Sequence, residues 1–364
     1  MAVFSTALRQ GLIAMLAVLA VSSWTLAAHA QAVDPMAPTS SAADAITSPL
    51  AAVSVATGDL ETARRFYQGV LGLAPREETL TGPAARRLAR HWGLGPTDRL
   101  SVTVFSNPYA PGSAMVRVVA VPADTPTGRP DVSSRYIGPL GFGMPMINIE
   151  QRKAIVSAFG FESTAGVVSM NFPRADKTTY KVSEIHFRAP DDMLVLGVDR
   201  GEQTQIGPID PALSMGGVAY ASFLVEDLET SGAFFRDVLG FELRREMSFR
   251  ASGPGGGMQD MRAQEVVAFL HWFSPGARTG YLVMMKLLDG GRLERRSNGF
   301  ATRGIAAWSF KTRDLNTVVR RWRAHSGKTA AIYAGELPGF GRVRAVMLRT
   351  PDGMPVEVVE RTKP

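Results

Sequence analysis

The sequence predicts an α+β fold made of four βαβββ modules, and three observations lead to that prediction. At a fixed offset of 168 residues, 56–73 and 224–241 share the same Asp, Leu, Glu, Thr, Phe, Val, Leu and Gly. A weaker copy in the same register starts at Asp314. The segments 186–193 and 347–354 also match around a Pro-Asp pair. An internal repeat of this kind decides the architecture before any single element is considered.

Each clear copy reads as a strand, a helix and further strands. A short apolar run precedes Asp59, Asp227 and Asp314, and each Asp stands where a helix N-cap belongs. Gly72 and Gly240 stand where a helix ends in a left-handed turn. Short strand-like segments follow, so the unit is βαβββ.

The remaining module is located by spacing. The step from Asp227 to Asp314 is 87 residues, about half of the 168-residue offset, which places an unmarked copy near position 143. Residues 144–149 followed by 151–160 fit a strand and a helix, although the Asp is missing. The 186–193 segment then reads as the hairpin between its last two strands.

These motifs resemble the vicinal oxygen chelate superfamily, which includes glyoxalase I, extradiol dioxygenases and bleomycin-binding proteins. The resemblance rests on the Asp-Leu-Glu-Thr…Phe…Val-Leu-Gly stretches and on the closing Pro351-Asp352-Gly353, and it covers about residues 50 to 361. It implies that the modules pair into two glyoxalase-like domains. Each domain would have curved mixed sheets around a cavity, with the helices outside.

Residues 1–30 are expected to be a signal peptide. Arg9 is the only charge before an apolar run from about Leu12 to Val21, and Ala28-His29-Ala30 has the form of a cleavage site. The run is shorter than the ~18 apolar residues that a membrane span needs. We therefore expect an exported, periplasmic or secreted protein with no membrane span.

The rest of the chain is long enough for two domains. We expect a disordered leader at 31–48, a first domain of modules one and two at 49–199, a linker at 200–215, and a second domain of modules three and four at 216–364. Whether the modules pair in this order or exchange across a dimer stays open, as does the choice between monomer and homodimer.

The composition excludes several classes of function. The chain has no Cys, which removes thiol nucleophiles, disulfides and lipidation at a lipobox. Its net charge of +7 comes mainly from arginines in small dispersed clusters, which favours a solvated basic surface. Export argues against a nucleic-acid partner. The glycine-rich 252–257 segment lacks the Lys-Ser/Thr of a phosphate loop and reads as a flexible connection.

The resemblance also implies where a metal would bind. One ligand, usually His, would lie in the first strand of a module, seven residues before the helix-capping Asp. These first-strand positions hold Ala52, Tyr220 and Ala307, and module two offers only Gly143 or a neighbour. None of these side chains is a usual metal ligand at this place, so no cofactor is expected.

The second ligand would be a Glu in the last strand, four residues after the Asp of the closing hairpin. Module two has Leu196 there and module four has Glu357. One carboxylate does not hold a metal. Glu357 instead needs a cation or a hydrogen bond to offset its burial, and Arg344 and Lys286 are candidate partners.

Other side chains offer further site candidates. Glu184 and His186 share one face of a strand whose other face carries Ile185 and Phe187, so they form a candidate ligand-binding, acid-base or relocated metal pair. Tyr220 suits stacking on a small organic molecule.

The other histidines of the mature chain are less informative. His271 lies in an apolar strand-like run. His91 and His325 are expected on the surface. His91 belongs to an inserted basic helix at 84–92, which is either a lid over the cavity or a larger loop.

Three functions remain open. The first is a metal-free protein that binds a small organic molecule, with Tyr220, Glu357, Glu184 and His186 as candidate ligand-binding residues. The second is a lyase or extradiol-type dioxygenase with one divalent ion at a non-standard site, for which Glu357 and His186 are the weak metal candidates. The third is a structural or partner-binding envelope protein.

Overall fold

The computed structural model describes residues 37–131, 133, 135–164, 166–173, 178–250, 264–289 and 293–362. The expected signal peptide, the first part of the expected leader (31–36) and the glycine-rich segment lie outside the described residues. Within the described ranges, no helix is both long and apolar enough to cross a membrane.

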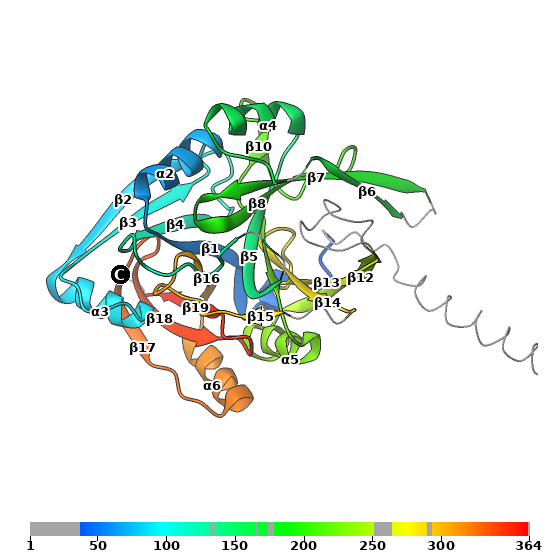
Figure 1. Ribbon diagram of the computed structural model, residues 1–364. Coiled ribbons are helices and arrows are strands. Elements are labelled where there is room, and N and C mark those ends of the chain that lie inside the picture. Colours follow the sequence, from blue (N-terminus) through cyan, green and yellow to red (C-terminus); the bar gives the residue numbers. More distant parts are fainter. Residues whose placement is uncertain are drawn as a thin grey trace, which may run out of the picture.

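All four predicted modules are present, each with one helical segment and four strands (Figure 1). Module one contains β1 (Thr47–Thr57), α2 (Leu60–Arg64) continued by η3 (Arg65–Val70), β2 (Ala74–Thr81), β3 (Arg99–Ser106) and β4 (Met115–Ala120). Module two contains β5 (Tyr136–Pro145), α4 (Ile149–Ala158), β6 (Val168–Pro173), β7 (Thr179–Ala189), η4 (Pro190–Asp192) and β8 (Met193–Asp199). Module three contains β11 (Tyr220–Leu224), α5 (Leu228–Ala233) continued by η5 (Phe234–Leu239), β12 (Glu242–Arg250), β13 (Val266–Phe273) and β14 (Tyr281–Leu287). Module four contains β16 (Gly304–Thr312), α6 (Leu315–Ser326), β17 (Ile332–Leu337), β18 (Gly341–Arg349) and β19 (Pro355–Arg361).

The segments outside this plan are short. They are η2 (Ala42–Asp44), the inserted helix α3 (Gly82–Trp92), the two-stranded β9 (Ile209–Asp210) and β10 (Met215–Gly216), and β15 (Glu294–Arg295), which pairs with β5. The β9–β10 pair lies in the expected linker, which is therefore partly ordered.

The strands form two curved mixed sheets, as the resemblance implies. The eight-stranded sheet has the order β17-β18-β19-β16-β1-β4-β3-β2, and the nine-stranded sheet has the order β12-β13-β14-β11-β5-β8-β7-β6 with β15 added to β5. The fold is α+β.

The modules do not pair in chain order. β1 of module one pairs antiparallel with β16 of module four, and β11 of module three pairs antiparallel with β5 of module two. The expected grouping of modules one and two against three and four is corrected at the level of the sheets: each sheet contains one module from each half of the chain. Every repeat has the same strand pattern and the same edge, so the repeat itself does not specify its partner.

The sequence signals at the helix ends are confirmed. Asp59, Asp227 and Asp314 are N-caps that accept from backbone N–H groups three residues on, at 3.0, 2.8 and 3.0 Å. Gly72 and Gly240, the predicted helix ends, have positive φ values of 62° and 74°, and Gly327 ends α6 in the same way at 68°. These caps satisfy orphan donors at the helix start, which explains why the repeat keeps them.

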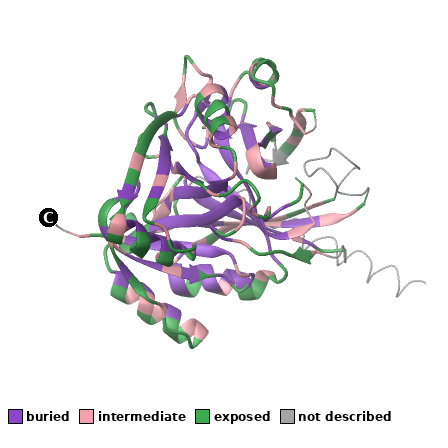
Figure 2. Ribbon diagram, turned by 60° about the vertical axis from the view of Figure 1, so that its left-hand side comes forward, coloured by how far each residue is buried: buried purple, intermediate pink, exposed green. Residues whose placement is uncertain are grey.

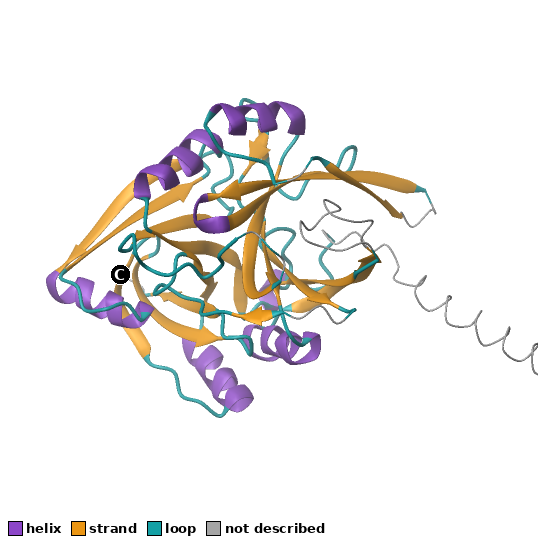
Figure 3. Cartoon of the chain, viewed as in Figure 1, coloured by secondary structure: helices purple, strands orange, loops and turns teal. Residues whose placement is uncertain are grey.

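The two sheets meet across one central core. Each sheet has an inward face in this core, which also takes up the apolar stripes of the module helices. Phe223 of one sheet contacts Trp308 of the other edge-to-face at 4.9 Å. The module helices lie at the periphery (Figure 3), and buried residues concentrate on the strands (Figure 2). The opposite, outward faces carry separate clusters of buried side chains, and both candidate sites lie there.

The Pro-Asp pairs of the two closing hairpins make contacts with other modules, which accounts for their repetition in the sequence. Asp352 accepts from the backbone N–H of Glu226 at 3.0 Å and from the Ser231 hydroxyl at 2.5 Å, which joins module four to the start of the helix of module three. In module two, Asp191 lies 3.7 Å from Arg303, at the start of module four. The Pro-Asp pair therefore has a structural role between neighbouring modules.

Candidate functional site

The inserted helix α3 covers the outward face of the eight-stranded sheet. Pro83 lies in its first turn and Gly93 ends it in a left-handed conformation with φ of 69°. Its buried stripe includes Ala85, Leu88 and Trp92, at helical spacing. This stripe packs into the buried cluster of the outward face, and Trp92 stacks on Phe300 with 4.4 Å between ring centroids.

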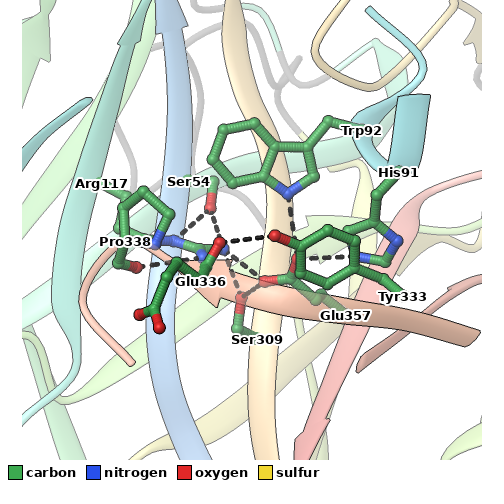
Figure 4. A network of polar contacts seen from close by, with 9 residues as sticks. All are labelled: Ser54, His91, Trp92, Arg117, Ser309, Tyr333, Glu336, Pro338 and Glu357. Atoms are coloured by element: carbon green, nitrogen blue, oxygen red, sulfur yellow. Dashed lines mark hydrogen bonds and ion pairs between the residues drawn. The ribbon is translucent and has the colours of Figure 1, made fainter. Parts of the chain in front are cut away.

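At its C-terminal end α3 contributes two side chains to Glu357 (Figure 4). The Trp92 indole N–H donates to Glu357 Oε1 at 3.0 Å, and His91 Nε2 lies 3.1 Å from the same oxygen. The other oxygen, Oε2, accepts from Arg117 Nη2 at 2.6 Å and from the Ser309 hydroxyl at 2.8 Å. Glu357 is fully buried, and protein groups use both of its oxygens.

Arg117 is the counterpart of Glu357 in module one. In the parallel pairing of β16 with β19, Ser309 lies opposite Glu357, and in the equivalent pairing of β1 with β4, Ser54 lies opposite Arg117. Ser54 and Ser309 each follow a first-strand ligand position by two residues. The last-strand positions of this sheet therefore hold one guanidinium and one carboxylate, which form an ion pair.

The ion pair is fully enclosed. Arg117 has no exposed surface, donates to Ser54 as well as to Ser309, and contacts two aromatic rings. Its guanidinium carbon lies 5.4 Å from the centre of Trp92 and 5.2 Å from that of Phe340. Burial by itself raises the pKa of Glu357, but the Arg117 charge and the hydrogen bonds from His91 and Trp92 hold that pKa well below its usual range.

These residues do not fit a divalent metal ion. A metal here would need Glu357 and His91 as donors, but each Glu357 oxygen is already used and the Arg117 charge lies within hydrogen-bond distance. Among the described residues, no group of three or more His, Cys, Asp and Glu side chains could hold a metal. The charge that the resemblance would assign to a metal is supplied by Arg117.

Two expectations are wrong at this site. His91, expected on the surface, has only 5% of its side chain exposed. The cation beside Glu357 is neither Arg344, which pairs with Glu360 at 2.8 Å, nor Lys286, which lies 3.9 Å from Asp227. Applying the repeat to the last strand of module one would have found Arg117, the only charged residue in the run Met115–Ala120.

The inserted helix itself is confirmed, over Gly82–Trp92. The sequence allows this helix to be either a lid over a cavity or a larger loop. In the structure its buried side chains pack on the outward face of the sheet. Its exposed arginines, Arg86, Arg87 and Arg90, form one of the expected basic clusters on the surface.

The outward face of the nine-stranded sheet is aromatic. Tyr220 stacks on Tyr281 with ring centroids 5.1 Å apart, and Phe273 stacks on the same ring at 4.6 Å. A Cβ atom at Gly143 would lie 1.9 Å from the Tyr220 ring, so glycine leaves the room that this ring occupies. The Tyr220 ring, which stands at the first-strand position of module three, thus fills the space beside Gly143 on the neighbouring strand.

The predicted faces of β7 are correct. Ile185 and Phe187 lie in the central core, whereas Glu184 and His186 lie on the outward side. Glu184 Oε2 is 3.5 Å from His186 Nε2. Burial, together with the Glu184 charge, raises the pKa of the Tyr220 hydroxyl. The structure therefore brings Tyr220, Glu184 and His186 to one face and places Glu357 on the other sheet.

His271 joins this face from β13. Its ring lies 5.6 Å from Tyr281, and burial together with the nearby Arg245 charge lowers its pKa to about 3. The imidazole is therefore neutral at physiological pH and has one donor and one acceptor nitrogen. No sequence pattern links His271 with Tyr220, because 51 residues separate them.

The last-strand positions of this sheet are apolar. In the parallel pairs Leu196 lies opposite Gly143 and Val283 lies opposite Ser222, so neither position has a metal donor. The same register makes Gly141, a neighbour of Gly143, the first-strand position of module two.

Comparison with known proteins agrees with this architecture. Residues 217–358 match the model of the Glyoxalase/Bleomycin resistance protein/Dioxygenase superfamily. The internal repeat extends the same module plan to the first half of the chain. Modules three and four therefore match this superfamily by sequence, as the resemblance to the vicinal oxygen chelate superfamily implies.

Two solved structures with this fold are similar over most of the chain. Glyoxalase I from Zea mays is 15% identical, with a TM-score of 0.56, and the match covers 86% of this chain and 92% of that one. A putative dioxygenase from Bacillus subtilis is 13% identical, with a TM-score of 0.53, and the match covers 87% and 86% of the two chains. No curated protein matches the sequence. At these identities the similarity establishes the fold, and the chemistry of this chain has to be argued from its own side chains.

Proposed function

We propose that this vicinal oxygen chelate protein is exported and binds a small organic molecule without a metal. The binding site is the outward face of the nine-stranded sheet, where Tyr220 and Tyr281 provide stacking surfaces. Glu184, His186 and His271 provide the polar groups that orient the ligand. Such a combination of apolar rings with a few polar groups is typical of small-molecule sites.

One observation carries this proposal. His186 Nε2 and His271 Nδ1 are both buried without a hydrogen bond to a described residue, although Glu184 Oε2 lies 3.5 Å from His186 Nε2. Buried polar atoms in native proteins nearly always have a partner. On a face lined by aromatic side chains, these two nitrogens are suited to polar groups of a bound molecule.

The eight-stranded sheet supports the metal-free part of the proposal. Its ligand positions are filled by the Arg117–Glu357 ion pair and closed by α3. Glu357 is the one carboxylate at the ligand positions of this sheet, and its ion pair with the Arg117 guanidinium disfavours a divalent ion electrostatically. Glu357 therefore stabilises this sheet and is not part of the proposed ligand-binding site.

The test is a ligand screen on secreted, untagged protein, followed by calorimetry with the best hit. The unsubstituted secreted protein is compared with two variants. His271→Phe keeps a ring and removes both nitrogens, and Tyr220→Phe keeps the stacking surface. We expect His271→Phe to weaken binding by about tenfold, the value of one lost hydrogen bond to a buried group. Tyr109→Phe is the matched control, because Tyr109 is half exposed and remote in sequence from this face. Binding that is unchanged in both His271→Phe and His186→Phe would place the ligand elsewhere.

Elemental mass spectrometry of the same sample decides between this proposal and metal-dependent lyase or dioxygenase chemistry. We expect no stoichiometric Fe, Mn, Ni or Zn after incubation with each ion. A stoichiometric metal that is lost in His186→Ala would establish the second hypothesis in place of ours.

Export rests on residues 1–30, which have the form of a signal peptide. The intact mass of the secreted protein is expected to correspond to a chain that starts at Gln31. A mass that includes residues 1–30 would contradict cleavage after Ala30.

A further inference from the structure

A pocket lies at one end of the eight-stranded sheet, away from the site of the proposed function. It has a volume of about 460 Å³, within the range of roughly 300–1,000 Å³ typical of small-molecule sites. It lies where β1, β4, β3 and β2 run side by side, and its lining includes Ala51, Met115, Val104 and Ala74 from these strands. None of the first-strand or last-strand ligand positions lines it.

The turn between β17 and β18 separates this pocket from the buried ion pair. Pro338 O accepts from Arg117 Nη1 at 3.5 Å, and the next residue, Gly339, lines the pocket. Gly339 has a φ of 83°, and a Cβ atom there would lie 2.4 Å from the Met115 sulfur. The turn and Met115 therefore form a closed inner wall, so the pocket is a separate site.

Both charged residues that line the pocket are basic. Its lining contains Arg76 and Lys311 and no Asp or Glu. The Lys311 ammonium group has no hydrogen-bond or ion-pair partner among the described residues, and the Lys311 backbone N–H donates to the Ser48 hydroxyl at 2.8 Å. Arg76 pairs with Glu78 at 2.6 Å, and Glu78 also accepts from the Gly339 N–H, so this cation is held beside the turn.

The remaining surface is mixed. Leu50, Val104 and Met115 provide buried or half-buried apolar surface. Ser106 adds a hydroxyl group, whereas the hydroxyls of Ser48 and Ser113 donate to the backbone carbonyls of Pro49 and Ala110 at 2.7 Å and can offer a ligand only an acceptor. A bound molecule would thus meet an apolar floor and cations with hydroxyl groups near the rim. This arrangement favours a molecule with an apolar body and one anionic group over a neutral or cationic molecule.

We propose that this pocket is a second binding site, for a small amphipathic organic anion such as a monocarboxylate. Lys311 and Arg76 hold the anionic group, and the apolar body lies against Met115 and Val104. This site is on a different sheet from the site of the proposed function and does not depend on it.

The test uses benzoate as the probe and benzamide as its neutral analogue, with binding to the full-length protein measured by calorimetry and ligand-detected NMR. We expect benzoate to bind and to weaken with added salt, and benzamide to bind more weakly. Lys311→Gln and Arg76→Gln should each weaken benzoate binding by about two- to fivefold, the range of an exposed ion pair. Lys328→Gln is the matched control, because Lys328 is exposed after α6 and does not line the pocket.

A variant that fills the pocket tests benzoate binding there without changing any charge. Ala74 is exposed on β2 and lines the pocket, so Ala74→Trp should fill it without disturbing the core and should abolish benzoate binding. Equal affinities for benzoate and benzamide would overturn the proposal, as would benzoate binding that survives in Ala74→Trp. Benzoate binding that is lost in His271→Phe and retained in Lys311→Gln would also overturn it, while supporting the site on the nine-stranded sheet.

Discussion

Glu357→Ala is expected to lower the free energy of unfolding by about 3–5 kcal/mol, the usual cost of breaking a buried ion pair by removing one partner. The substitution leaves the guanidinium of Arg117 without a counter-charge in a fully buried position. It also removes the acceptor of the Trp92 and Ser309 hydrogen bonds. Chemical denaturation followed by circular dichroism measures the loss.

A double variant separates the cost of the unpaired charge from the value of the pair. Arg117→Met combined with Glu357→Leu replaces both charges with apolar groups, which is often close to neutral for buried pairs. We expect the double variant to be more stable than either Arg117→Met or Glu357→Leu alone. If the losses of the single variants simply added, the two side chains would not interact as the structure shows.

Trp92→Ala is expected to lower the free energy of unfolding by about 3–5 kcal/mol, as for other large buried aromatic residues. The indole stacks on Phe300, lies beside the Arg117 guanidinium and donates to Glu357. Its removal leaves a cavity under α3 and weakens the contact of the helix with the sheet. Thermal unfolding, together with hydrogen exchange of the α3 amides, measures both effects.

The matched control lies on the same helix. Arg86→Ala removes an exposed ion pair with Asp98, which is worth about 0–1 kcal/mol. A loss in Trp92→Ala no larger than in Arg86→Ala would mean that α3 is not held by its buried face. Because Trp92 and Glu357 are in direct contact, their combined loss is expected to be smaller than the sum.

Much of the local structure could be read from the repeat. Asp59, Asp227 and Asp314 were recognised as caps because the chemistry of a helix start is local and needs only a side chain three residues from its partner. The faces of β7 followed from strand alternation, which puts Ile185 and Phe187 in the core and Glu184 and His186 outside it. The loss of metal ligands was likewise visible as residue identities at fixed offsets.

The candidate sites were only partly predictable. The sequence predicts Tyr220, Glu184 and His186 as site residues but not His271, because His271 reaches Tyr220 only through Tyr281 on the strand β14 that pairs between them. His91 was misplaced because its helix has an exposed basic face, Arg86, Arg87 and Arg90, that resembles a surface helix in sequence. Only docking of the opposite face shows that the end of α3 is buried.

The sequence by itself determined the module, its four copies, the Asp caps of three of them and the absence of metal donors at most ligand positions, because each depends on contacts within a few residues or on side-chain type alone. The tertiary structure decided which modules share a sheet and that Arg117 opposes Glu357. These outcomes depend on pairing between strands of different modules, far apart in the sequence, because the first strands β1 and β16 present similar edges to several possible partners. Register then fixes the rest, because in the parallel pairs one residue of offset turns a side chain from the site into the core.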